Sequence, residues 1–172
     1  MTSHRLYLLR HAKSSWDEPE LSDHDRPLAK RGRKATKLVR EHLREERVSP
    51  DLVLCSSAVR AVQTLEGIRD ALGEAQVAVE SGLYRAGANA LLNRLHDLPE
   101  EVGDVMLIGH NPAIEGLADE LAGQGGDPDA RERMATKYPT GGLATFGFSG
   151  RWSELDWEGA QLESFVVPRE LG

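Results

Sequence analysis

Cysteine and long apolar runs are both scarce in this sequence. Cys55 is the single cysteine, which excludes an internal disulfide framework and a zinc site built from several cysteines. No apolar stretch approaches the roughly 18 residues that a membrane-spanning helix needs, and residues 1–5 lack the apolar core of a secretory signal. We therefore expect a cytoplasmic protein with no membrane partner.

Basic residues are also in the minority. The chain has 21 Lys and Arg against 28 Asp and Glu, a net charge of -7, and such a chain is a poor general binder of nucleic acid. Hydrophobic residues nevertheless make up 40% of its 172 residues, which is a globular composition. This length suits one domain over residues 1–172 with a full core.

Short apolar segments alternate with amphipathic ones along the first 122 residues. The apolar segments predict buried strands at 5–9, 51–55, 77–79 and 104–108. The amphipathic segments predict helices at 30–47, at 88–98, at 113–122, and from an N-cap at Ser56 or Ser57 to about 72. Residues 12–28 are polar and proline-containing, so they indicate a loop.

The character of the chain changes after residue 122. Residues 123–139 are rich in Gly, Asp and Arg and predict a mobile loop. Residues 143–148 and 161–167 predict two strands of a hairpin. Together these elements indicate an α/β sandwich whose internal sheet is mostly parallel with an antiparallel edge. In such folds ligands bind beyond the carboxyl ends of the strands.

Polar side chains follow three of the predicted strands at those ends. They are Arg10 and His11 after the first strand, Arg60 in the helix after the second, and residues 109–112 (GHNP) after the strand at 104–108. Arg60 belongs to this set because helical side chains lean toward the N-terminus of their helix. Pro112 suits a first helical turn. We expect two guanidiniums and two imidazoles to meet at one edge of the sheet.

This combination of side chains predicts a site for a tetrahedral dianion. Arginine forks bind phosphate oxygens in pairs and keep their charge. A neutral imidazole can attack phosphorus with one nitrogen when its other nitrogen donates a proton elsewhere. The second imidazole, if protonated, would neutralise charge on the phosphoryl oxygens. Nothing in the spacing requires a metal or another cofactor.

Several motifs resemble those of the histidine phosphatase superfamily, in the family's order. They are residues 10–16 (RHAKSSW), residues 57–64 (SAVRAVQT) and residues 109–112. Two further segments, residues 25–28 (DRPL) with Gly32 and residues 137–142 (KYPTGG), are similar to the short branch that contains the SixA phosphohistidine phosphatases. The resemblance implies a three-layer α/β/α sandwich like that of phosphoglycerate mutase.

The resemblance also implies roles for individual residues. His11 would be the nucleophile that becomes phosphohistidine, and His110 would stabilise the transferring charge. Arg10 and Arg60 would clamp the phosphoryl group, with Asn111 beside them in substrate binding. Water would then release inorganic phosphate, without a metal or cofactor.

One expected group has no clear match in this sequence. Ester-cleaving members of the family carry an acid carboxylate after the strand that we predict at 77–79, and the candidates here are Glu80, Asp17, Asp23 and Asp25. An alkoxide needs a proton as it leaves, whereas the imidazole of a phosphohistidine can leave neutral. The missing acid therefore favours P–N bonds or activated esters, and the preferred substrate is protein phosphohistidine.

Three alternatives stay open from the sequence. The same fold can take small phosphorylated metabolites, or the chain can be a phosphoprotein-binding module without turnover. Cys55 can be the nucleophile, although only four residues separate it from Arg60, one fewer than a tyrosine-phosphatase loop contains.

Tyr84 and Arg85 are candidates for the pocket rim, whereas His4, His24, His42 and His96 are interpreted as ordinary. Basic residues between 26 and 47 indicate a solvated helix face or a docking surface for an acidic partner.

Overall fold

The strands pair into one six-stranded sheet. The computed structural model describes residues 2–172, and the strand order is β3-β2-β4-β1-β5-β6. The strands are β1 (Ser3–Arg10), β2 (Leu52–Ser56), β3 (Gln76–Glu80), β4 (Val105–Gly109), β5 (Leu143–Ser149) and β6 (Gln161–Val166). β1, β4, β2 and β3 pair in parallel, whereas β5 pairs antiparallel with both β1 and β6. The mostly parallel sheet with an antiparallel edge is thereby confirmed.

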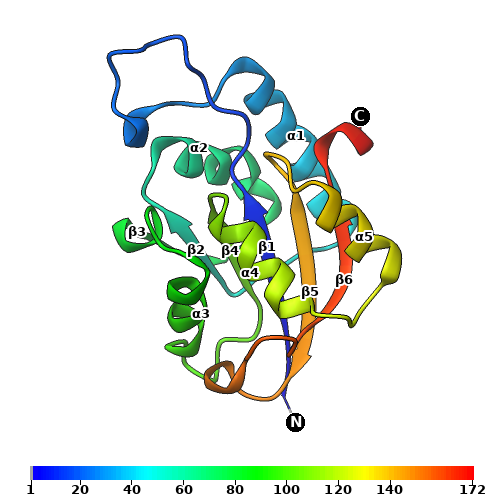
Figure 1. The fold of residues 1–172 in the computed structure, drawn as a ribbon. Helices are drawn as coiled ribbons and strands as arrows, with labels where there is room; N and C mark the ends of the chain where they lie inside the picture. The colour runs from blue at the N-terminus through cyan, green and yellow to red at the C-terminus, as the bar shows by residue number, and fades with distance from the viewer. Residues whose placement is uncertain (1) are drawn as a thin grey trace.

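Helices cover both faces of this sheet (Figure 1). They are α1 (Lys30–Glu45), α2 (Val59–Ile68), α3 (Ala88–His96), α4 (Ala113–Ala122) and α5 (Pro128–Thr136). One buried cluster joins the sheet to α1 and α2, and a second joins it to α3, α4 and α5. The three-layer α/β/α sandwich is therefore confirmed. No helix within residues 2–172 is long and apolar enough to cross a membrane.

The apolar runs of the central strands are explained by burial on both faces. Side chains alternate along a strand, so Leu6 and Leu8 of β1 enter the cluster under α3–α5 while Tyr7 and Leu9 enter the cluster under α1 and α2. Burying a leucine side chain stabilises the fold by about 1.5–3 kcal/mol. A continuous apolar run, rather than a polar–apolar alternation, is what a strand covered twice requires.

The register of the parallel strands brings their carboxyl ends level. Leu9 of β1 and Cys55 of β2 both pair with Ile108 of β4, and Arg10 pairs with Gly109. The residues that follow these strands therefore emerge side by side at one edge. Residues 12–28 extend beyond that edge (Figure 1).

The predicted mobile loop at 123–139 was wrong, because it contains α5. Asp127 caps this helix by accepting a hydrogen bond from the Ala130 amide at 2.8 Å, and Pro128 occupies the first turn. Ala130 and Met134 are buried against the sheet. The Asp-Pro pair was a usable helix-start signal, which the polar composition of the segment obscured.

The element boundaries needed smaller corrections. Neither Ser56 nor Ser57 caps α2: the N-cap is Ala58, whose amide donates to Ser56 Oγ at 3.2 Å. α1 ends at Glu45, α2 gives way to a 3-10 turn at Arg69–Ala71, and α3 ends at His96. The loop at 12–28 contains a 3-10 turn at Asp23–Asp25 and a bridge between Ser14 and Leu28.

Candidate active site

His11 lies immediately beyond β1 with one ring nitrogen already engaged. Its backbone amide donates to the Gly109 carbonyl at 3.0 Å, which joins the ends of β1 and β4. Its Nδ1 lies 2.7 Å from the Ala12 carbonyl oxygen, which can only accept a hydrogen bond. Nδ1 is therefore the protonated nitrogen, and Nε2 keeps its lone pair.

Electrostatics hold the same ring neutral. The side chain is buried, and burial is the main reason that the pKa of His11 falls to about 3, with nearby His110, Arg60 and Arg10 adding to the effect. Arg60 Nε donates to His11 Nε2 at 3.3 Å, which also requires an unprotonated Nε2. His11 thus presents a nucleophilic nitrogen toward a guanidinium at neutral pH.

Arg60 reaches this nitrogen from the second position of α2. Its Nη1 donates to the Asp23 carbonyl at 2.6 Å and its Nη2 to Asp23 Oδ2 at 2.9 Å. One turn later, Thr64 Oγ1 accepts from the Ala12 amide at 2.9 Å and donates to the Arg60 carbonyl at 2.7 Å. Thr64 therefore fixes the chain after His11 to the helix that carries Arg60, which explains its place in the motif.

Arg10 is supported by the segment after α5. Its Nη1 donates to the Tyr138 carbonyl at 3.0 Å, and the Gly141 amide donates to the Arg10 carbonyl at 2.9 Å. Gly141 has a φ of 77°, a conformation that glycine adopts without strain. Burial lowers the pKa of Arg10, and its Nε is buried without a hydrogen-bond partner.

Asn111 holds this support in place. Its Nδ2 donates to the Tyr138 carbonyl at 3.1 Å, and its Oδ1 accepts from the Glu115 amide in α4 at 3.2 Å. Both ends of the amide are therefore engaged within the protein, so the geometry gives Asn111 a positioning role beside its predicted role in substrate binding. Pro112 takes the N-cap position of α4, one residue before the helical turn predicted for it.

His110 meets His11 across the site, with 5.1 Å between the ring centroids. Its Nε2 lies 2.7 Å from Ser56 Oγ, and its Nδ1 is buried without a partner. Burial, with Arg60 next in importance, lowers the pKa of His110 to about 4. His110 is therefore neutral at pH 7 in the free protein, so the protonated state considered from the sequence would require the charge of a bound phosphoryl group.

Among the four candidate acids, Asp23 contacts Arg60. Its Oδ2 accepts from Arg60 and from the Tyr84 hydroxyl at 2.6 Å. The hydrogen bond from Tyr84 is the largest cause of the lowered pKa of Asp23, so this carboxyl is ionised at neutral pH. A carboxylate in this state orients Arg60 and is a poor proton donor.

The other three candidates are engaged or exposed elsewhere. Glu80 accepts from Arg94 Nε at 2.8 Å and from its Nη2 at 2.9 Å, which lowers the pKa of Glu80. Asp25 lies 3.4 Å from His24, and Asp17 is exposed. None of these contacts reaches the two imidazoles.

The sequence predicts no site role for Arg26 or His24, yet both lie beside the residues described above. The Arg26 side chain is buried, donates to Ser14 Oγ, and lies 3.4 Å over the Trp16 ring. Its Nε is 3.6 Å from Asp23, and both Nε and Nη1 lack hydrogen bonds. Arg26 belongs to the DRPL motif, but the motif does not show where its side chain points. The sequence predicts an ordinary role for His24; in the structure its Nε2 lies 2.9 Å from Ser57 Oγ and its ring packs against Tyr84.

The geometry bears on the Cys55 alternative and on the expectation that no metal is needed. Cys55 is buried in the core, and burial raises the pKa of its thiol to about 12, which opposes a role as nucleophile. Residues 2–172 contain no group of three or more His, Cys, Asp or Glu side chains placed to hold a metal ion. Metal-independent chemistry stays a prediction.

Known sequences place the chain among phosphatases. A sequence profile of the histidine phosphatase superfamily (branch 1) matches residues 6–85. An uncharacterised protein of Mycobacterium leprae is 39% identical over 166 residues, which cover 94% of this chain and 100% of that protein. The phosphohistidine phosphatase SixA of Escherichia coli is 32% identical over 126 residues, which cover 68% of this chain and 73% of SixA.

Solved structures agree with the sequence relatives. A candidate phosphohistidine phosphatase SixA from Nakamurella multipartitia matches with a TM-score of 0.85 at 30% identity over 98% of both chains. A candidate alpha-ribazole-5'-P phosphatase from Escherichia coli, at a TM-score of 0.64 and 20% identity over 96% of this chain and 98% of that one, shares the fold alone. Together with the order of the motifs around His11, these likenesses show that the chain belongs to the histidine phosphatase superfamily, and they support phosphatase activity.

Proposed function

We propose that this protein hydrolyses phosphohistidine in proteins through a covalent intermediate on His11. The observation that carries the proposal is the fixed tautomer of His11: Nδ1 is bonded to the Ala12 carbonyl, and Nε2 faces Arg60. A nucleophile for phosphoryl transfer needs a free lone pair beside positive charge.

In the first step, His11 Nε2 attacks phosphorus. A P–N bond forms to His11 while the P–N bond to the substrate imidazole breaks, and the bonding electrons leave with that imidazole. It departs neutral when its other nitrogen is protonated. Arg10 and Arg60 stabilise the charge on the phosphoryl oxygens, and the Nδ1–H bond to Ala12 persists throughout.

In the second step, water attacks the phosphorus of phospho-His11. A P–O bond forms, the P–N bond breaks with its electrons returning to Nε2, and the water proton passes to the released phosphate. His110 lies opposite His11 with Nδ1 unpartnered. A Ser56 hydroxyl that donates to its Nε2 would leave the His110 proton on Nδ1, as a donor for the phosphoryl oxygens.

The preference for phosphohistidine over alkyl esters is supported by the state of Asp23. Asp23 is the candidate acid that contacts Arg60, and its lowered pKa makes it a poor proton donor. An imidazole leaving group needs no such donor, whereas an alkoxide does.

Small phosphorylated metabolites are the second candidate substrates, because a candidate small-molecule phosphatase shares the fold. The test compares a phosphohistidine peptide with an alkyl phosphate at matched concentration, using wild type, His11→Ala and Cys55→Ser. We expect the peptide to be turned over faster than the alkyl phosphate, and we expect His11→Ala to lose turnover. Turnover should be unchanged in Cys55→Ser and when a metal chelator is added to wild type.

Each other result assigns a different function. Faster turnover of the alkyl phosphate favours the metabolite phosphatase. Binding of the phosphopeptide by wild type and His11→Ala alike, without turnover of either substrate, favours a binding module. The cytoplasmic location expected from the sequence stays a prediction.

A further inference from the structure

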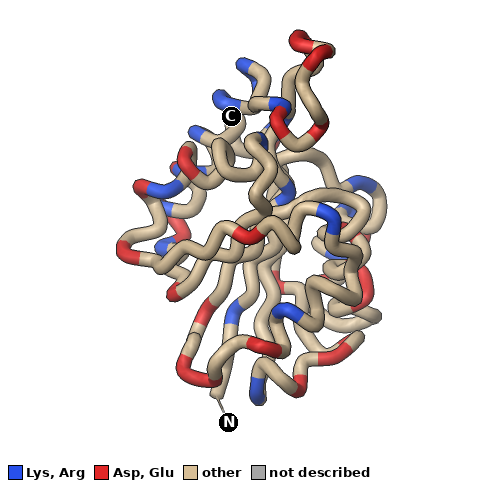
Figure 2. The backbone as a smooth tube through the Cα atoms, turned by 90° about the vertical axis from the view of Figure 1, so that its left-hand side faces the viewer, with Lys and Arg blue, Asp and Glu red and all other residues tan. Residues whose placement is uncertain are grey.

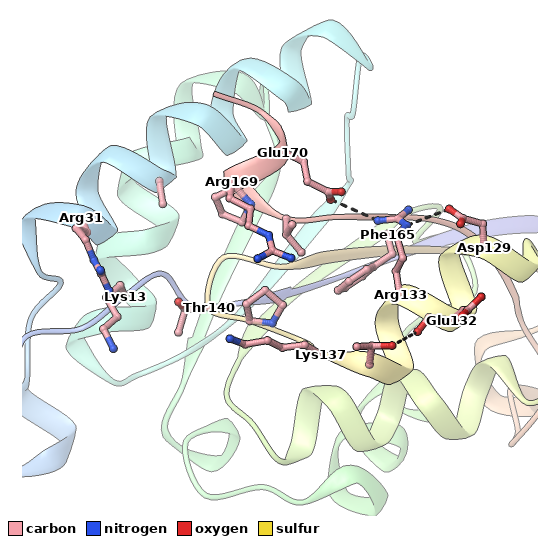
Figure 3. Close-up of a pocket in the computed structure, with 15 residues that line it drawn as sticks. Lys13, Arg31, Asp129, Glu132, Arg133, Lys137, Thr140, Phe165, Arg169 and Glu170 are labelled. Atoms are coloured by element: carbon pink, nitrogen blue, oxygen red, sulfur yellow. Dashed lines mark hydrogen bonds and ion pairs between the residues drawn. The ribbon is translucent and has the colours of Figure 1, made fainter.

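A separate pocket of about 630 Å³ lies beside the catalytic site. Its walls come from Lys13, the start of α1, the length of α5, residues 137–140, and the end of β6 with the following 3-10 turn (Figure 3). Because β1 and β6 both end here, the pocket opens at the same edge of the sheet as the catalytic site. A volume of this size can take several side chains of a bound segment.

Basic side chains gather at one end of this pocket. Lys13, Arg31, Lys137 and Arg169 line it, all four are exposed, and none makes a side-chain ion pair or hydrogen bond within residues 2–172. Figure 2 shows Lys and Arg positions around the C-terminus of the chain. In a protein with a net charge of -7, such a local excess attracts anions against the overall field.

The opposite end of the pocket carries an excess of acidic residues. Arg133 donates to Asp129 at 3.0 Å and to Glu170 at 3.4 Å, as the dashed lines in Figure 3 show. Two of the three acidic residues in the lining, Asp129 and Glu170, therefore share a single arginine, so this end repels a bound anion. The attraction for an anion is concentrated at the basic end.

The floor of the pocket is apolar. Phe165 and Val167 are buried in it, with Ala35, Pro139 and Pro168 around them. None of the buried polar atoms that lack a partner in residues 2–172 belongs to its lining. Sites for small molecules usually fix their ligand with a few precisely placed polar groups, whereas an apolar centre with an exposed charged rim is typical of a protein interface.

The pocket is joined to the catalytic site through two short segments. Lys13 lies two residues after His11, and a Cβ on Gly32 would lie 2.1 Å from the Lys13 carbonyl oxygen, so α1 packs directly on this segment. Lys137 precedes Tyr138, whose carbonyl accepts from Arg10. A macromolecule that presents a phosphoryl group to His11 therefore passes close to the basic end.

We propose that this pocket docks an acidic segment of the phosphorylated partner protein, with carboxylates at Lys13, Arg31, Lys137 and Arg169 and an apolar side chain over the half-buried Ala35, Pro139 and Pro168. The docking role rests on the proposed action on a phosphoprotein. It adds a specificity site that contacts the partner away from the phosphorylated residue.

The test uses two labelled peptides that share a leucine and a histidine and differ only in flanking residues, three Glu in one and three Gln in the other. The proteins are wild type, Arg31→Glu/Arg169→Glu, and the matched control Arg47→Glu/Arg69→Glu, whose residues are exposed and lie outside the pocket. Binding is measured by fluorescence anisotropy with unphosphorylated peptides, and kcat/KM is measured with the phosphohistidine forms.

We expect the Glu peptide to bind wild type and the control better than the Gln peptide does. The pocket variant should weaken Glu-peptide binding and lower its kcat/KM about tenfold, while turnover of the Gln peptide and of p-nitrophenyl phosphate stays unchanged. Equal binding of the two peptides to wild type, or an equal loss in the control, would overturn the docking role.

Two further outcomes separate the possible failures. If neither phosphohistidine peptide is turned over, the proposed function fails, and the binding measurement still decides the docking role. If inorganic tripolyphosphate binds through Arg31 and Arg169 while neither peptide binds, the pocket takes free polyanions and the docking proposal is wrong.

Discussion

The proposed catalytic site and the basic pocket lie at one edge of the sheet, and both are rich in cations, but they differ in burial. Arg60 and Arg26 are 7% and 6% exposed, and Arg60 is held by hydrogen bonds to Asp23 and His11. Arg31 and Arg169 of the pocket are exposed and have no ion pair within residues 2–172. Burying a charge costs desolvation free energy, whereas exposed charges are screened by salt.

This difference in burial indicates that the two groups of cations have different functions. Preorganised, water-poor charge stabilises a developing phosphoryl charge without having to reorganise. Exposed charge on flexible side chains attracts and orients a partner, and contributes little to the chemical step. Substitutions in the two regions should therefore affect different kinetic quantities.

The largest expected difference comes from removing one arginine in each region. Arg60→Ala should lower kcat on a phosphohistidine peptide about 100- to 1,000-fold, the usual effect of removing one fixed donor to the transition state. Arg169→Ala should leave kcat unchanged and act through KM for acidic peptides alone. Steady-state kinetics with both peptides measures this, and an equal loss of kcat in both variants would break the comparison.

Acid should destabilise the protein through the catalytic site. The pKa values of His11 and His110 are lowered from 6.5 to about 3 and about 4, so the unfolded chain binds more protons than the folded one below pH 6.5. The free energy of unfolding should then fall by about 1.4 kcal/mol per pH unit for each such imidazole, as the pH falls from 6.5 toward 4.

Denaturant unfolding at several pH values measures this slope. His11→Gln/His110→Gln should flatten it, because glutamine does not titrate. Arg31→Glu/Arg169→Glu should retain the contribution of the two imidazoles. An unchanged slope in the histidine variant would show that other groups dominate acid unfolding.

The smallest expected effect lies at the junction between the two regions. Gly32→Ala would place a Cβ 2.1 Å from the Lys13 carbonyl oxygen, and should destabilise the protein by about 1–3 kcal/mol. Gly116→Ala is the matched helical control, because its nearest contact is the Ala88 Cβ at 3.5 Å. Thermal unfolding compares the stability of the two variants with that of wild type. Equal stability of Gly32→Ala and Gly116→Ala would mean that α1 can move away from Lys13.

Sequence periodicity and strand ends predicted the framework of the site. Arg10, His11, Arg60 and His110 follow level strands or begin the next helix, so parallel pairing alone brings them together. Asp23, Arg26 and Tyr84 depend instead on the path of irregular segments, which have no period from which contacts can be inferred. α5 was missed for a related reason, because few apolar residues mark its buried face.

The central claim is that His11 receives the phosphoryl group on Nε2. The direct measurement is to mix the protein with a ³²P-labelled phosphohistidine peptide, quench within milliseconds, and map the modified residue. We predict acid-labile label on His11, retained in Cys55→Ser and absent from His11→Ala. Label on any other residue, or label that persists in His11→Ala, would contradict the claim.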